Sequence, residues 1–418
     1  MSNEKVMNRW LVVIGAVLIQ LALGAIYAWS VFTPELEEAG WSKVNTQAVF
    51  SIGLLFFALV MVWAGKQLNT LGPRKLSIAS GIVLGGGYLL AGLFGGTDVI
   101  ALSIMIGVIG GSGIGLGYVV PIAVGMRWFP DKKGLITGLA VAGFGFGAMG
   151  WVKLAGAWGN LLQTIGLSGT FTAYGIAFAV MVILGGLVMV FPPEGWKPEG
   201  YDEPTTDSSG QAAAGTVNFE SGEMLKTPQF YMIWLTFFFG ASAGLMSIGL
   251  MKLYPMEALQ ASGFSKMQAS AIAGTAMAVF FSLANGLGRI GWGVISDKLG
   301  RKTSIMIMTG SQGLIVLAFT YMAGTPALLY LGATIIGFNF GGNFALFPAI
   351  TSDTFGTKNV GSNYPFIFLS YGIGGIAGPI MGGMLGDMGN FPIAFTICGV
   401  ACIVGAVLIS TVKPPKKQ

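Results

Sequence analysis

The feature that most constrains this chain is a series of long apolar runs without a charged residue. The first run, 10–34, has 25 residues, and others follow until residue 412. About 20 apolar residues in a helix are enough to cross a bilayer. Charged residues make up 9% of the chain and mean hydropathy is +0.74, whereas a soluble domain carries about 25% charge. The sequence therefore predicts an all-α membrane protein and excludes a cytosolic enzyme, a fibrous protein and a disordered chain.

The uncharged runs predict twelve transmembrane helices. The longest run, 303–352, has 50 residues, twice the length of a spanning helix, and Gly324, Thr325 and Pro326 form the natural turn within it. Six spans precede a polar segment and six follow it. This predicts an N-terminal half over 1–191, a cytoplasmic linker over 192–226 and a C-terminal half over 227–418. The predicted spans are 10–34, 44–65, 76–97, 99–126, 134–152, 169–191, 227–251, 267–288, two within 303–352, 359–386 and 388–412.

The basic residues predict the orientation of these spans. If the N-terminus is cytoplasmic, 17 of the 22 Lys and Arg residues lie in inside segments and four lie outside or near the outer interface. Positive charge accumulates on the cytoplasmic side of membrane proteins. We therefore expect a multi-pass protein of the inner or plasma membrane with both termini in the cytoplasm. The linker is rich in Pro, Ser and Thr and is predicted to be flexible, with a short helix within 219–226 lying at the membrane surface.

Two loops indicate an internal repeat. The loop after the second span reads GKQLNTLGPRK from Gly65, and the loop after the eighth reads GVISDKLGRK from Gly293. The second copy aligns on the first with a constant shift of 228, and a shift of 227 places Pro121 on Pro348. Two homologous six-helix halves explain this spacing better than the general abundance of Gly and Lys in short loops.

The second of these loops resembles the signature of the major facilitator superfamily, in which it lies between helices 8 and 9. The resemblance implies twelve helices in two pseudo-symmetric halves. It also implies a conformational switch formed by Asp297 and Arg301 and shaped by Gly293 and Gly300. The first copy departs from the signature because Asn69 stands in place of Asp and Pro73 in place of a base.

Other blocks are similar to the oxalate/formate antiporter family, which is related to the monocarboxylate transporters. These blocks lie in loops of both halves, so the match does not depend on one motif. They are RWFPDKKG at 127–134, SGEMLKTPQF at 221–230, FP-x3-SD-x-FG at 347–356 and NY at 363–364. The resemblance implies a carrier of small carboxylates.

Arg289 is the one basic residue that the topology leaves inside a span. It precedes Asp297 by eight residues, which places it about 12 Å from that end of the helix. A charge at this depth costs at least about 2.5–3.5 kcal/mol. One reading is that the long side chain reaches back to cytoplasmic water. The reading we favour is that the guanidinium binds a carboxylate in bidentate geometry, with Asn285 on the same helical face binding the guanidinium, the substrate or a neighbouring helix.

The absence of certain ionisable groups from the spans limits how this protein could move protons and which anions it could bind. The chain has no His, and we find no Asp or Glu at mid-membrane depth. The sequence therefore offers no carboxylate or histidine side chain within the membrane for a proton relay. In the related monocarboxylate transporters an Asp commonly stands where this chain has Asn285. Oxalate carriers of the resembling family have a Lys where it has Tyr371. Because one cation balances one carboxylate, the site suits a monoanion better than oxalate.

Aromatic residues are expected to build the rest of the pocket, although many aromatic residues in spans simply face lipid or pack. The family position favours the tyrosines, whose hydroxyl groups would bond a 2-hydroxy or 2-keto oxygen. The candidates are Tyr27, Tyr118, Phe340, Phe344, Phe368 and Tyr371. Glycines of the fourth and fifth spans are expected to let helices approach closely. They are Gly111, Gly113, Gly115, Gly117, Gly143, Gly145, Gly147 and Gly150.

These observations predict a secondary transporter of small monocarboxylates such as lactate, pyruvate, formate or acetate, working by alternating access with coupling to protons expected. Two rivals stay open, an oxalate:formate-type anion exchanger and a carrier-like membrane sensor. An enzyme is not expected, because a nucleophile–base pair or metal ligands within the membrane are hard to assemble from this sequence. We expect no metal, no cofactor and no nucleic-acid partner. The expected partners are the small carboxylate, the lipid bilayer and protons, and a monomer is favoured.

Overall fold

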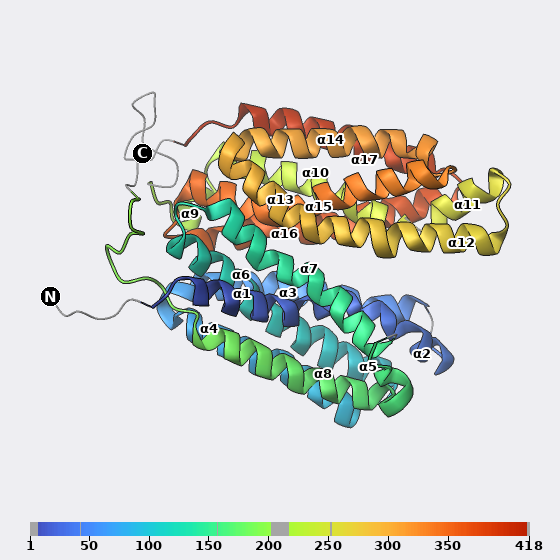
Figure 1. The fold of residues 1–418 in the computed structure, drawn as a ribbon, viewed down its shortest axis with the longest axis horizontal. Coiled ribbons are helices and arrows are strands. Elements are labelled where there is room, and N and C mark those ends of the chain that lie inside the picture. The colour runs from blue at the N-terminus through green and yellow to red at the C-terminus, as the bar shows by residue number, and fades with distance from the viewer. Residues whose placement is uncertain (1–6, 42, 157, 202–216, 251–252, 416–418) are drawn as a thin grey trace. The chain divides into compact units, whose positions relative to one another are not determined.

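The computed structural model describes residues 7–41, 43–156, 158–201, 217–250 and 253–415 (Figure 1). Every regular element in these ranges is a helix, and twelve helices are long and apolar enough to cross a membrane. The predicted fold class and number of spans are thereby confirmed. Contacts within the chain divide it into two units, 1–204 with 360–365, and 205–359 with 366–418.

The first unit contains six of the candidate membrane spans, and its long helices lie side by side (Figure 1). Three spans are assembled from consecutive helical segments, because short 3₁₀ or π-helical stretches continue an α-helix without a break. The elements are α1 (Trp10–Leu23), η1 (Gly24–Val31), α2 (Thr33–Glu38), α3 (Lys43–Leu71), α4 (Pro73–Leu90), η2 (Ala91–Gly95), α5 (Val99–Leu102), η3 (Ser103–Gly110), α6 (Gly111–Trp128), α7 (Lys133–Ala155) and α8 (Leu161–Leu187).

The second unit repeats this plan with a short helix before its first span. That helix, α9, is the one expected near 219–226, and Glu220 and Glu223 close its first turn as a capping box. The elements are α9 (Ser221–Met224), α10 (Pro228–Leu250), α11 (Leu253–Ala261), α12 (Lys266–Thr275), η4 (Ala276–Phe281), α13 (Ser282–Leu299), α14 (Arg301–Met322), α15 (Pro326–Phe355), α16 (Val360–Asp387) and α17 (Phe391–Thr411). By the contact division, the first residues of α16, 360–365, belong to the first unit.

Some predicted span boundaries were wrong. The eighth span was ended at 288 because Arg289 is charged, but α13 continues to Leu299. The sixth was started at 169, whereas α8 begins at Leu161 and is interrupted at Gly166, where φ is 69°. A charge ends an uncharged run without ending a helix, which is why the first error arose. The turn expected at 324–326 was correct, since α14 ends at Met322 and α15 begins at Pro326.

The two repeated loops share a backbone conformation. Gly72 precedes α4 with φ 84° and ψ 154°, and Gly300 precedes α14 with φ 83° and ψ 153°. This region of the backbone map is essentially restricted to glycine. The sequence repeat with a shift of 228 is thus also a repeat of local structure.

Glycines bring the helices of each unit into backbone contact. A Cβ atom added at Gly111 or Gly115 would meet the backbone of α3, and one at Gly113 would meet the backbone of α4. Gly147 faces the backbone of Leu21 in the same way. Gly150 is an exception, because nothing lies within 4 Å of its added Cβ. Close packing was therefore correctly expected for α6 and wrongly for Gly150.

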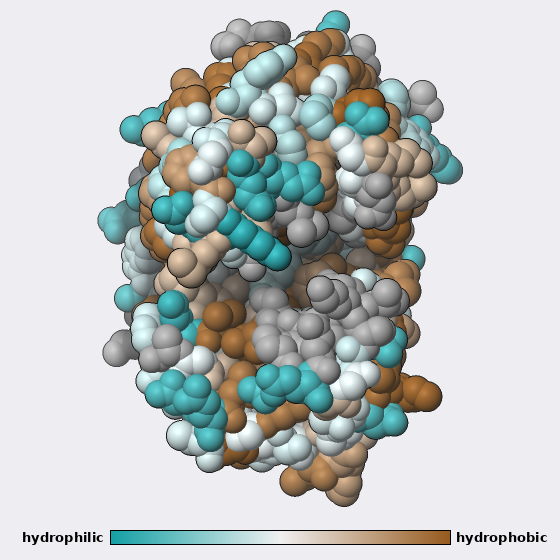
Figure 2. Space-filling model, turned by 90° about the vertical axis from the view of Figure 1, so that its right-hand side faces the viewer, coloured by the Kyte–Doolittle hydropathy of each residue, from teal (hydrophilic) through white to brown (hydrophobic). Residues whose placement is uncertain are grey.

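The exterior of the long helices is apolar. Large hydrophobic side chains such as Ile82, Leu93, Ile176 and Ile376 are each more than half exposed. In water such surfaces would promote association, whereas acyl chains match them. Figure 2, which looks onto one end of the molecule, shows hydrophilic residues gathered in patches on that end among hydrophobic ones. This distribution fits helices whose sides face lipid and whose ends face water.

Candidate functional site

Arg289 of α13 is the centre of the candidate site. Its side chain is 1% exposed. Its Nε donates a hydrogen bond to Oδ1 of Asn285 over 3.2 Å, and its Cζ lies 4.2 Å from the ring centroid of Phe344 in α15. An aromatic face at this distance attracts a guanidinium electrostatically. The guanidinium plane is therefore held from two directions, by an amide oxygen and by a ring.

The side chain points away from the end of α13 that carries Asp297. Asn285 lies one turn toward the start of the helix, as expected from the direction in which helical side chains tilt. Arg289 lies ten positions before the last residue of α13, Leu299, a distance of about 15 Å along the axis. This direction and depth oppose the alternative in which the side chain extends to water at the Asp297 end.

Close contact between α13 and α15 brings Phe344 to the guanidinium. A Cβ added at Gly341 would meet the backbone oxygen of Asn285, and one added at Gly288 would meet the backbone of Phe338. Only glycine at both positions allows the helix backbones to approach this closely. The sequence prediction named neither glycine.

Phe344 is also the hub of an aromatic cluster within the second unit. Its ring centroid lies 5.2 Å from Tyr371, 5.4 Å from Phe340 and 6.4 Å from Phe368. These separations are typical of interacting aromatic pairs. The structure thus brings together six predicted residues, namely Arg289, Asn285, Phe340, Phe344, Phe368 and Tyr371. A residue that the prediction missed, Phe237 of α10, completes the cluster 6.2 Å from Phe368.

The remaining predicted residues, Tyr27 and Tyr118, meet within the first unit. Each packs edge-on against Phe144 of α7, at centroid distances of 5.2 and 5.4 Å. Tyr118 is 1% exposed, whereas Tyr27 is half-buried. Phe144 was not predicted, although its position among glycines in α7 was a usable signal. A Cβ added at Gly24 would meet the backbone of Phe144, so α7 lies against η1 at this point.

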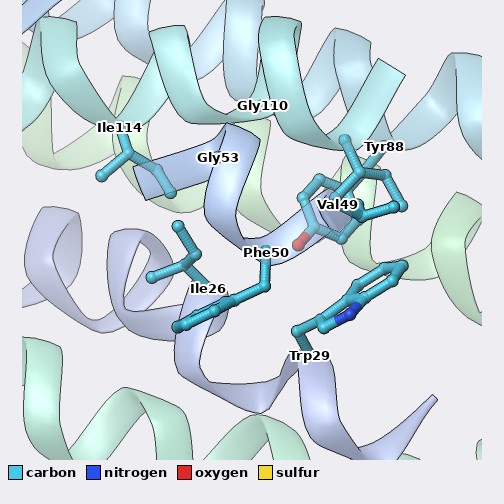
Figure 3. Close-up of a pocket in the computed structure, with 9 residues that line it drawn as sticks. Ile26, Trp29, Val49, Phe50, Gly53, Tyr88, Gly110 and Ile114 are labelled. Carbon is cyan, nitrogen blue, oxygen red and sulfur yellow. The ribbon is translucent and has the colours of Figure 1, made fainter. Parts of the chain in front are cut away.

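A small cavity in the first unit is a poor candidate for binding a carboxylate. It lies between η1, α3, α4, η3 and α6 and is lined mainly by apolar side chains, among them Ile26, Phe50 and Ile114 (Figure 3). Its volume of about 10 Å³ is at the lower limit for a single water molecule.

A polar chain lies one turn beyond Arg289 and was also missed. Trp292 donates from Nε1 to Oδ1 of Asn339 over 3.1 Å, and Nδ2 of Asn339 donates to Oγ of Ser311 over 3.0 Å. These bonds connect α13, α15 and α14. In an apolar environment, hydrogen bonds between helices favour one packing arrangement over others, so the chain helps hold the helix that carries Arg289.

An ion-pair cluster lies at the end of α13. Nη1 of Arg301 lies 2.6 Å from Oδ1 of Asp297, and Nε of Arg301 lies 3.1 Å from Oδ2 of Asp353 in the last turn of α15. Nη1 also donates to Oγ of Ser296 over 2.6 Å. Gly293 accepts a hydrogen bond from Ser296 through its backbone oxygen. The pairing of Asp297 with Arg301 was expected, whereas the roles of Asp353 and Ser296 were not.

The matching loop of the first unit uses different chemistry. Asn69 stands where Asp297 stands in the repeat, and its Oδ1 accepts a hydrogen bond from Nη2 of Arg127 over 2.9 Å. The guanidinium of Arg127 also lies 3.7 Å from the ring centroid of Phe191. A neutral amide thus replaces the carboxylate, and the base comes from the end of α6.

Replacing Gly300 by alanine is expected to destabilise the protein by about 1–3 kcal/mol, because an L-residue is strained at this φ and ψ. An added Cβ would meet nothing within 4 Å, so the cost is that of the backbone alone. The measurement is thermal unfolding of purified protein in detergent. Gly383→Ala in α16 is the control, since its added Cβ also meets nothing and alanine favours a helix. Equal stability of the two variants would contradict the expectation.

Comparison with known proteins agrees with this fold. The family model described as Major Facilitator Superfamily matches residues 10–364 and 255–418. Among solved structures, that of the transporter FucP in the outward conformation has a TM-score of 0.64 at 14% identity, covering 96% of this chain and 99% of its own. The chain belongs to the Major Facilitator Superfamily, and it is a membrane transporter of that fold.

Several curated relatives cover most of the chain. The uncharacterized MFS-type transporter YhjX of Escherichia coli (strain K12) is 31% identical over 88% of this chain and 86% of its own. The oxalate:formate antiporter of Oxalobacter formigenes is 27% identical over 97% and 92%. Apicoplast pyruvate carrier 1 of Toxoplasma gondii is 24% identical over 80% and 67%. The expected family is confirmed by these matches.

Proposed function

We propose that this protein is a secondary carrier of small monocarboxylates of the lactate, pyruvate, formate and acetate class. The observation that carries the proposal is the buried guanidinium of Arg289, held by Asn285 and by the ring of Phe344. The substrate's carboxylate would accept hydrogen bonds from the terminal nitrogens of Arg289. A planar fork suits a carboxylate, and low-polarity surroundings strengthen the attraction between the charges.

The surroundings of Arg289 favour one negative charge on the substrate. Besides Arg289, the buried charged side chain among the described residues is Lys133, which lies in the first turn of α7. Tyr371, which is 3% exposed, occupies the position of the second cation expected in an oxalate carrier. A second carboxylate facing these rings would be buried without a counter-charge, at a cost of several kcal/mol.

The relatives support the same substrate class. One is named an oxalate:formate antiporter and another a pyruvate carrier, and formate and pyruvate are monocarboxylates. We propose further that the carrier works by alternating access, in an inner or plasma membrane, with both termini in the cytoplasm. The ion-pair cluster of Arg301 would then be formed in one state of the cycle and broken in another.

Coupling to protons is the finer part of the proposal. The chain has no His, so the carboxyl group of the substrate, or water near tyrosine hydroxyl groups, would carry the proton. The alternative is exchange of one anion for another, as the name of the antiporter relative suggests.

Transport by purified protein in liposomes separates these possibilities. Uptake of labelled lactate is expected to rise several-fold when an inward proton gradient is imposed, and pyruvate, formate and acetate are expected to compete better than oxalate. Uptake that requires an internal carboxylate, whatever the pH gradient, would establish exchange and exclude symport. If no carboxylate is taken up or exchanged by protein that binds one, the carrier-like sensor becomes the better description.

A further inference from the structure

The last part of the central linker packs against the second unit at the C-terminal end of α15. The backbone N–H of Phe219 donates to the backbone oxygen of Phe355 over 2.9 Å, and their rings meet edge-on at 5.9 Å. Asn218 accepts a hydrogen bond from the N–H of Lys358 over 3.0 Å, and Asn359 donates from Nδ2 to the backbone oxygen of Phe219 over 2.8 Å. Three hydrogen bonds and a buried ring therefore define an attachment that we name the distal clip, residues 218–219.

The clip covers a turn that only glycine can form. Gly356 ends α15 with φ at 96°, and a Cβ added there would meet Asn218. Phe219 and Phe355 are 3% and 0% exposed. Burying a phenylalanine side chain stabilises its site by about 1.5–3 kcal/mol. The clip is therefore a packed part of the second unit.

The clip lies next to the ion-pair cluster. Asp353, which binds Nε of Arg301, precedes Phe355 by two residues in the last turn of α15. Ser352 of the same turn bonds Thr357 beyond the glycine over 3.0 Å. The clip thus holds both sides of the turn that follows Asp353, and it fixes where α15 ends and where that carboxylate lies.

The other end of the linker makes a matching attachment in the first unit. The rings of Trp196 and Trp128 meet at 4.7 Å, and Nε1 of Trp128 donates to the backbone oxygen of Val190 over 2.7 Å. Trp128 is the last residue of α6. Its neighbour Arg127 makes the hydrogen bond to Asn69, so this attachment also lies beside a contact at a repeated loop.

The two linker attachments lie at positions that the internal repeat relates to each other. Adding 227 to 128 gives 355, so the linker places an aromatic ring on equivalent residues, Trp128 and Phe355, at the ends of equivalent helices. Adding 228 to 69 gives 297, so one residue of each neighbouring contact, Asn69 or Asp297, is equivalent as well, although its partner differs. The linker contacts equivalent positions in both units although the residues at these positions differ. This favours a shared role for the two attachments over incidental packing.

We propose that Asn218 and Phe219 are positioning residues for the conformational switch. They hold the last turn of α15 so that Asp353 meets Arg301, and their release from the turn at 356–359 accompanies the opening of that ion pair. Trp196 has the corresponding role for Arg127 and Asn69. The proposal rests on the transport cycle of the proposed function but not on the identity of the substrate.

Thiol labelling tests the clip without any substrate. Cys398 and Cys402 are replaced by alanine, and Ser296→Cys provides a reporter that is 1% exposed and contacts Arg301 in the closed cluster. The labelling rate with a maleimide is then compared between this background and the same background with Asn218→Ala or Phe219→Ala. Each is expected to raise the rate about fivefold or more, since a hydrogen bond of ordinary strength corresponds to about that factor in an equilibrium.

Matched variants make the result decisive. Asp353→Asn breaks the ion pair directly and is expected to raise labelling at least as much. Glu199→Ala changes an exposed linker residue and is expected to leave the labelling rate unchanged. Phe219→Tyr keeps the ring and is expected to label as slowly as the parent background. A difference between Phe219→Tyr and Phe219→Ala would show that the ring contact itself controls the labelling rate. If Asn218→Ala and Phe219→Ala label like Glu199→Ala while Asp353→Asn labels fast, the proposal is wrong. Because no carboxylate is present, failure of the monocarboxylate assignment would leave this result intact.

Discussion

Arg289→Lys is expected to lower monocarboxylate uptake in liposomes at least about 30-fold, although the charge is kept. A lysine offers no planar fork to a carboxylate, and the loss of one hydrogen bond to a charged group costs about 2 kcal/mol, or about 30-fold. It also cannot donate from an Nε–H to Asn285 while lying flat against Phe344, as the guanidinium does. Initial rates across a range of lactate concentrations measure the loss.

The matched control is Arg74→Lys. Arg74 is exposed in the first turn of α4, so uptake by this variant should equal that of the parent protein. Thermal unfolding in detergent should show that Arg289→Lys remains folded. Uptake by Arg289→Lys at the parental rate would show that a positive charge alone is sufficient, and the assignment of Arg289 as the carboxylate ligand would fall.

The fold could be predicted because the membrane imposes simple rules. Backbone groups in lipid must be satisfied within a helix, so each long apolar run had one available structure. Even the division of 303–352 followed from a single Gly-Thr-Pro turn. Boundaries were less certain, as α13 shows, because the helix extends through Arg289 to Leu299 and its charged residues lie in its last turns.

Residues of the candidate site could be predicted only where burying one side chain in the membrane costs enough free energy to require a polar partner. Arg289 met that condition, and Asn285 followed from its spacing along the same helix. Phe144, Phe237 and Asp353 did not, because their importance comes from helices that are distant in sequence. Helical periodicity shows which residues share a face, but it does not show which face of another helix they meet.

Contacts between glycines and backbones explain why these partners were missed. Gly341 and Gly24 allow approaches that no larger residue permits, and such approaches decide which aromatic side chains are brought together. A glycine in a membrane helix is common, so its presence alone did not identify the contact. The charge of Arg289 within a span was the stronger signal in this chain.

Introducing a second cation is expected to change the preferred substrate. Tyr371→Lys would place an ammonium group against Phe344, whose ring also contacts Arg289. With a monocarboxylate bound, one of the two cations would lack a counter-charge, so lactate and formate uptake should fall at least about tenfold. With oxalate bound, both charges are paired, and oxalate uptake should become measurable. Competition between labelled formate and unlabelled oxalate measures the change.

Tyr371→Met and Tyr371→Phe separate charge from shape. Methionine has about the length of lysine without its charge, and phenylalanine removes only the hydroxyl group. Neither should transport oxalate, and Tyr371→Phe should retain formate uptake unless that hydroxyl binds the substrate. If Tyr371→Met gains oxalate as Tyr371→Lys does, the size of the pocket rather than its charge sets the preference. If Tyr371→Lys keeps the parental preference, residue 371 does not face the substrate. The presence of a single cation, Arg289, would then no longer support a preference for a monoanion. A charge at position 371 can select the substrate only if it lies close to the substrate's carboxylate in surroundings of low polarity.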